Sequence, residues 1–199
     1  RMNPLALLLR QGILLIDAIL RRLYGVWEFS QDPRCLLRLS LGHSPMTTTL
    51  SDGTHLRAGD PICIIHLWNE RVPPISSSGA TLAWARAMRA NMAHSLRLLA
   101  AYVAVEPRLH HVVAFGGETS IFTAQTLGRP HDLLGKWGFD YIEAESKRLP
   151  QQRLRRFLDR MYAWALMWAF NPGTLRSKTF SNVGRCYIWI SRPELLARY

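Results

Sequence analysis

Apolar residues recur at helical spacing in three long stretches of the chain, and each stretch predicts one long helix. The first stretch covers residues 5–24 and follows Asn3-Pro4, a capping residue with a proline at the first helical position. The second covers residues 81–103. The third covers residues 151–170 and is basic in its first half but almost entirely apolar and aromatic in its second.

Strand patterns lie mainly between the first two helices and recur later in the chain. Turn signals at residues 51–54 and 58–60, each with an aspartate beside a glycine, separate the early strands and indicate an antiparallel meander. The predicted strands cover residues 36–41, 47–50, 62–65, 111–115, 139–142 and 186–190.

These elements predict an α+β fold, because the strands come partly as a meander and partly between helices. We expect a mixed, mainly antiparallel sheet packed by two or three long helices. Residues 26–199 are expected to form a single domain, and residues 1–25 an N-terminal amphipathic helix.

The first predicted helix carries its charges on one stripe. Arg10, Asp17 and Arg21 share a side at helical spacing, while leucine, isoleucine and alanine fill most of the remaining positions. These charges argue against a membrane-spanning helix, which needs about 20 almost uncharged residues, and against a cleaved signal peptide. Two interpretations stay open: the helix packs on the domain, or it lies in a membrane interface with its basic stripe towards lipid headgroups.

The chain is strongly basic, with a formal net charge of +11 over 199 residues. All of its basic residues except Lys136, Lys147 and Lys178 are arginines, which suit forked contacts to phosphate or carboxylate groups. This balance favours an anionic partner: a lipid, a phosphorylated or sugar ligand, or nucleic acid.

The three cysteines lie in apolar surroundings without a CxxC pair, which argues against a disulfide scaffold or a zinc ribbon. This usage fits a reducing compartment. We therefore expect a cytoplasmic protein, at the inner membrane surface if its helices contact lipid. No residue pattern indicates a cofactor or a resident metal.

The strongest candidate for a functional site is the group of polar residues that follows the predicted strand 62–65. If the strand continues, His66, Trp68 and Glu70 share one face, and Asn69 lies on the other. A histidine and a carboxylate on one face can act as an acid/base pair, or as two metal ligands that lack a third. The alternative is that Glu70 is solvated at the strand end and His66 is hydrogen-bonded within the sheet.

A second group of polar residues lies on the helix predicted at residues 81–103. Arg86, Arg89 and Arg97 could hold an anion, and His94 could face the same cleft as His66. The run Gly116-Gly117-Glu118-Thr119 follows a strand but lacks both common phosphate-loop patterns, so it is interpreted as a tight turn.

Three segments, "LSDGTHLRAGDPICIIHLWNE" at 50–70, "SLRLLAAY" at 95–102 and "VVAFGGET" at 112–119, resemble the YkoP-like domain. This bacterial family occurs alone or beside polysaccharide deacetylase modules. The resemblance runs from about Arg34 to Phe139. It implies a cell-envelope context and leaves His66 and Asn69 as the polar positions of the family pattern, but it carries over no catalytic residue.

Three functions remain open. The first is a peripheral membrane protein of envelope lipid or polysaccharide metabolism, whose strand end binds an anionic headgroup or sugar. The second is a small hydrolase or transferase, with His66 as general base, Glu70 as its partner, and an arginine of the second helix holding the substrate. Nucleic-acid binding ranks third, because the aromatic residues beyond the basic part of helix 151–170 are typical of a core or a membrane contact.

Overall fold

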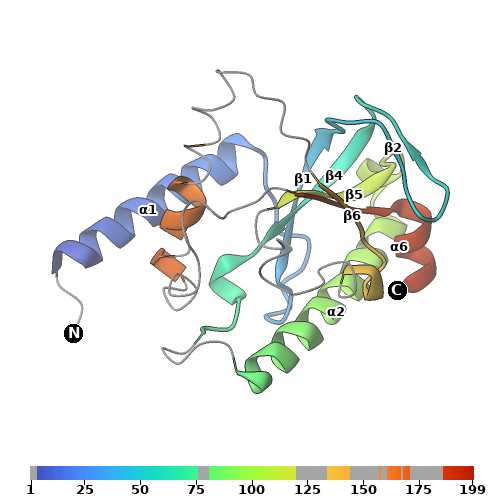
Figure 1. Cartoon of the computed structure of the whole chain (residues 1–199). Coiled ribbons are helices and arrows are strands. Elements are labelled where there is room, and N and C mark those ends of the chain that lie inside the picture. Colours follow the sequence, from blue (N-terminus) through green and yellow to red (C-terminus); the bar gives the residue numbers. More distant parts are fainter. Residues whose placement is uncertain are drawn as a thin grey trace.

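The computed structural model describes residues 4–75, 81–119, 134–143, 157, 161–166, 168–170 and 186–199. Its centre is a five-stranded sheet with the strand order β1-β4-β5-β7-β6, in which only β4 and β5 run parallel. The strands are β1 (Leu37–His43), β4 (Pro61–Leu67), β5 (Ala114–Thr119), β6 (Asp140–Glu143) and β7 (Cys186–Ser191). A mixed, mostly antiparallel sheet with helices confirms the predicted α+β class (Figure 1).

The helices are α1 (Pro4–Leu23), α2 (Leu82–Val105) and the short α6 (Arg192–Arg198), with single 3₁₀ turns η1 (Asn69–Arg71) and η2 (Pro107–Leu109). The first two agree with the predicted helices at 5–24 and 81–103. Of the third predicted helix, residues 157, 161–166 and 168–170 are helical, and the others lie outside the described residues. Among the described residues, no helix combines the length and apolar character needed to cross a membrane.

The predicted antiparallel meander forms as one long strand pair and one separate small hairpin. β1 pairs directly with β4 along its whole length, from Leu37 opposite Leu67 to His43 opposite Pro61. The chain between them makes a separate small hairpin, β2 (Thr48–Thr49) with β3 (His55–Leu56), around the predicted turn at 51–54.

The two glycines at 116 and 117 correct one prediction. They were expected to end a strand in a tight turn, but both lie inside β5, where Gly116 is paired with Ile64 on one side and Trp189 on the other. Gly116 has φ +147, and a Cβ there would overlap the Ile188 carbonyl oxygen. Glycine is therefore required at this position by the close approach of β7 and not by a turn.

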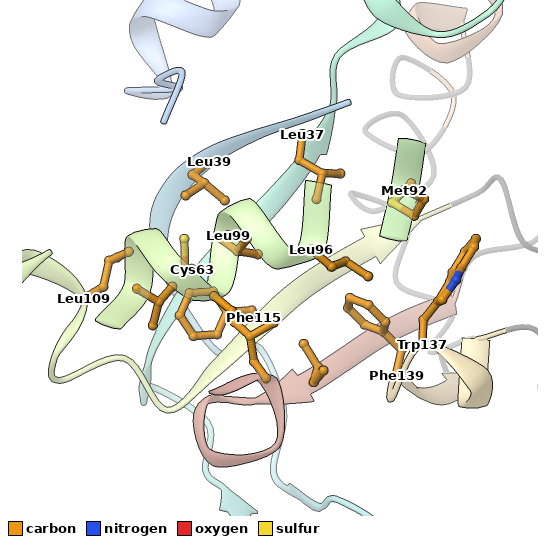
Figure 2. Packing of buried hydrophobic residues seen from close by; sticks show 14 of the residues in the cluster. Leu37, Leu39, Cys63, Met92, Leu96, Leu99, Leu109, Phe115, Trp137 and Phe139 are labelled. Carbon is orange, nitrogen blue, oxygen red and sulfur yellow. The ribbon is translucent and has the colours of Figure 1, made fainter. Parts of the chain in front are cut away.

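The main core lies between the sheet and α2. Leu96 and Leu99 of α2 are fully buried against inward-facing residues of the sheet, including Leu39 and Phe115 (Figure 2). Val103 of α2 is fully buried in the same cluster. A smaller cluster fills the opposite face beneath the β2–β3 hairpin; its buried members are Leu50, Leu56, Ile62, Ala114 and Trp189. The sheet is thus covered on both faces, by different elements.

Candidate functional site

The polar residues after β4 do not continue the strand. β4 ends at Leu67, and the chain turns into η1, so Glu70 leaves the strand direction before it can share a face with His66. Trp68, predicted on a ligand-binding rim, is instead only 6 % exposed. Its ring lies between two guanidinium groups, with Arg38 4.1 Å and Arg71 3.3 Å from the ring centre.

His66 forms a hydrogen bond inside the sheet. Its Nε2 lies 2.8 Å from the Oγ of Ser40 on the neighbouring strand β1. Burial, together with the nearby positive charge of Arg38, lowers the pKa of His66 below its usual 6.5. Ser40 is only 2 % exposed, so a substrate would not reach its hydroxyl without displacing surrounding chain.

Glu70 is paired with arginines. One of its oxygens lies 3.2 Å from Nη1 of Arg38 and the other lies 3.2 Å from Nη1 of Arg21. Arg38 also pairs with Glu28, at 3.1 Å. We call these four residues, Arg21, Glu28, Arg38 and Glu70, the ion-pair cluster.

Arg38 is the centre of the ion-pair cluster. Only 6 % of the residue is exposed, although it carries a full charge. It is held by two carboxylates and by the face of Trp68, and its Nε is buried without a hydrogen-bond partner in the part of the chain that the structure describes. Arg38 was not among the predicted site residues. The alternation of residues 37–41 puts it on the face opposite Leu37 and Leu39, but this local pattern does not show that the second face is covered.

The polar stripe of α1 faces the domain. Asp17, only 6 % exposed, accepts a hydrogen bond of 2.6 Å from the Tyr162 hydroxyl and pairs with Arg21 at 3.0 Å. The Nε of Arg10 donates to the carbonyl oxygen of Ala169 over 2.9 Å. The stripe therefore packs on the domain, in contrast to the alternative in which its basic residues point towards lipid headgroups.

The consequence is an apolar surface on the outer side of α1, which we call the α1 face. Its large side chains are between 47 % and 75 % exposed. They are Leu7, Leu8, Leu9, Leu15, Ile16, Ile19 and Leu23, continued by Tyr24. In Figure 1, α1 runs out to one side of the sheet, away from α2 and α6.

A cavity of about 290 Å³ lies between α1 and β1, next to the ion-pair cluster. We call it the α1–β1 cavity. Its walls combine apolar side chains with charged ones: Leu15, Ala18, Ile19, Arg21, Arg22, Val26, Glu28 and Arg38.

The predicted residues of α2 lie on the other side of the sheet from His66. α2 packs against Leu37 and Leu39, whose side chains alternate along β1 with those of Arg38 and Ser40. The structure therefore does not bring His66 together with the three arginines predicted to bind an anion, all of which are exposed: Arg86, Arg89 and Arg97.

His94 interacts with Asp32 and not with His66. Its Nε2 lies 2.7 Å from a carboxylate oxygen of Asp32, and this hydrogen bond is the main reason that the pKa of Asp32 falls to about 2. Arg89 lines a different cavity of about 270 Å³ with Lys136, Trp137 and Arg198. Asn69 begins η1 and is half-buried.

Metal-binding chemistry has no candidate within the described residues, because no three histidine, cysteine or carboxylate side chains gather there. Cys35, Cys63 and Cys186 are all buried. Burial raises the pKa of Cys63 to about 12 and that of Cys186 to about 11, so neither is an activated thiolate.

Comparison with known proteins identifies the family. The family model of the YkoP domain matches residues 8–199, a wider span than the resemblance at 34–139, so the chain belongs to the YkoP-domain family. Searches of curated proteins and of solved structures both found no match.

Proposed function

We propose that this YkoP-domain protein binds peripherally to an anionic lipid bilayer through the α1 face. The observation that carries the proposal is the inverted packing of α1: Arg10, Asp17 and Arg21 contact the domain, and the large apolar side chains of the α1 face are exposed. A soluble domain gains nothing from this arrangement, because exposed apolar surface is unfavourable in water.

The free energy gained by burying the side chains of the α1 face is sufficient for membrane binding. Full burial of a leucine or isoleucine side chain contributes about 1.5–3 kcal/mol, so a side chain that is half to three-quarters exposed recovers roughly 1–2 kcal/mol on entering the bilayer. Several such residues lie on the α1 face, among them Leu8 at 70 % and Leu15 at 62 % exposed. Three or four of them inserting together would give stable, reversible binding.

The positive net charge of the chain favours an anionic bilayer as the partner. The chain carries a net charge of +11. Each basic residue held near an anionic surface adds about 1 kcal/mol, an effect that salt weakens. Arg22 is exposed beside the apolar residues of α1 and is placed to make such a contact. We extend this proposal to a role at the cell envelope, in lipid or polysaccharide metabolism.

Enzymatic catalysis by His66 and Glu70 has less support. Glu70 is occupied by Arg21 and Arg38, and the hydrogen-bond partner of His66, Ser40, is buried. A general base needs access to the proton it removes.

The test is co-sedimentation of the full chain with phosphatidylglycerol vesicles and with phosphatidylcholine vesicles at low salt. We expect strong binding to the first and weak binding to the second. Leu8→Glu should lower the partition coefficient at least about tenfold, because it removes apolar contact and adds a charge that the anionic surface repels.

Leu82→Glu is the matched control. Leu82 is 67 % exposed at the start of α2, and the substitution makes the same change in net charge. It should leave vesicle binding within about twofold, since a twofold change is well under 1 kcal/mol. Equal losses in both variants would refute the α1 face as the contact. A stable dimer by light scattering, without vesicle binding, would show that a second copy covers α1 instead.

A further inference from the structure

We propose that the α1–β1 cavity binds the phosphate group of a single anionic amphiphile, whose hydrocarbon part lies along the α1 face. This inference rests on the proposed membrane function and deepens it by assigning a ligand class. Inorganic phosphate shares the headgroup chemistry, so the test below separates the two.

Three arginines, Arg21, Arg22 and Arg38, line the cavity, together with the carboxylate of Glu28. Asp17 and Glu70 also pair with Arg21 and Arg38, so Arg22 is the lining arginine that has no ion pair among the described residues. Guanidinium groups bind phosphate through paired, charge-assisted hydrogen bonds, and arginine is the residue best suited to this contact.

Arg38 supplies the buried part of the site. Its side chain is only 7 % exposed, so a phosphate in contact with it is largely shielded from water. A charge pair gains strength as water is excluded. Its Nε is buried and unpaired within the described part of the chain, and its contacts to Glu28 and Glu70 run through the two Nη groups. An Nη group released by Glu28 is therefore the donor that a phosphate would meet.

Glu28 is the group that an incoming phosphate would replace. Its side chain is 40 % exposed, and it contacts Arg38 through one oxygen at 3.1 Å. Glu70 is held more firmly, because it contacts two arginines. A ligand phosphate can therefore take the place of Glu28 while Glu70 keeps Arg38 in position.

The apolar wall distinguishes an amphiphile from a free ion. Leu15 and Ile19 line the cavity and also belong to the α1 face, with 62 % and 50 % of their surface exposed. The cavity thus opens directly onto the surface that we propose enters the bilayer. A headgroup in the cavity would leave its hydrocarbon chains against these two residues.

The experiment is calorimetric titration of the full chain with dihexanoyl phosphatidic acid below its micelle concentration. Inorganic phosphate and dihexanoyl phosphatidylcholine are titrated in parallel. We expect the phosphatidic acid to bind most tightly. Arg22→Gln should weaken its binding about fivefold to tenfold, and Glu28→Gln should tighten it by a similar factor because the competing carboxylate is gone.

Arg86→Gln serves as the control, because Arg86 is an exposed arginine on α2, across the sheet. Unchanged affinity in both Arg22→Gln and Glu28→Gln would overturn the inference. Equal affinity for inorganic phosphate would overturn its amphiphile part. If vesicles still bind while the short-chain lipid does not, this inference fails and the proposed function stands; if neither binds, both fail.

Discussion

Neutralising Glu70 tests whether the ion-pair cluster holds α1 and the sheet together. Glu70→Gln keeps the size of the side chain but removes the charge that faces Arg21 on α1 and Arg38 on β1, both at 3.2 Å. Arg38 is then left with Glu28 alone, in a position where only 7 % of its side chain meets solvent.

The expected loss of stability depends on how exposed the ion pairs are to solvent. Breaking a fully buried pair costs about 3–5 kcal/mol, whereas an exposed pair contributes at most about 1 kcal/mol. Glu70 is 36 % exposed and Arg21 is 29 % exposed, so solvent screens part of each interaction. We expect a loss of about 2 kcal/mol in the free energy of unfolding, which lowers Tm by about 4–8 °C for a chain of this size.

The assay is urea unfolding at low and at moderate salt, followed by far-UV circular dichroism. Glu143→Gln is the control, because it makes the same charge change at an exposed residue of β6 and should alter stability by no more than about 0.5 kcal/mol. A double-mutant cycle with Arg21→Gln then measures the part of the loss that passes through α1. Equal stability of the Glu70 and Glu143 variants would show that the ion-pair cluster does not stabilise the fold.

Two further predictions concern the sheet. The lowered pKa of His66 means that the unfolded chain takes up this proton at higher pH than the folded chain, so stability falls as the pH decreases through and below 6.5. An NMR titration should place the His66 midpoint below 6.5 in the folded protein, and His66→Gln should flatten the decline in stability; a midpoint at or above 6.5 would contradict this. Gly116→Ala should cost more than about 3 kcal/mol because its Cβ overlaps the Ile188 carbonyl, while Gly12→Ala, with nothing within 4 Å in α1, should be neutral or stabilising. Thermal unfolding of both variants checks this pair, and a well-folded Gly116→Ala protein would show that β5 and β7 can separate.

The chain belongs to the YkoP-domain family, but the proposed membrane binding is argued from the packing of α1 in this structure. The resemblance in the sequence singled out His66 and Asn69, whereas the structure directs attention to α1 and to Arg38. His66 satisfies its hydrogen bond inside the sheet, which is the alternative left open by the sequence.

The elements with strong local periodicity could be predicted from the sequence alone. α1, α2, β4 and β7 lie within a few residues of their predicted bounds, and the α+β class follows from their order. Such patterns are local, because a helix or a strand repeats its apolar side chains over neighbouring residues. The turn at 51–54 was predictable for the same reason.

Which faces of these elements are covered depends on contacts between segments that are distant in the sequence. The polar stripe of α1 could point outward or inward, and its direction depends on Tyr162 and Glu70, which are remote from Asp17 and Arg21 in the sequence. The burial of Arg38 likewise depends on carboxylates from two other segments. A charge can be buried only where such partners compensate its lost hydration, and their positions depend on how the whole chain folds.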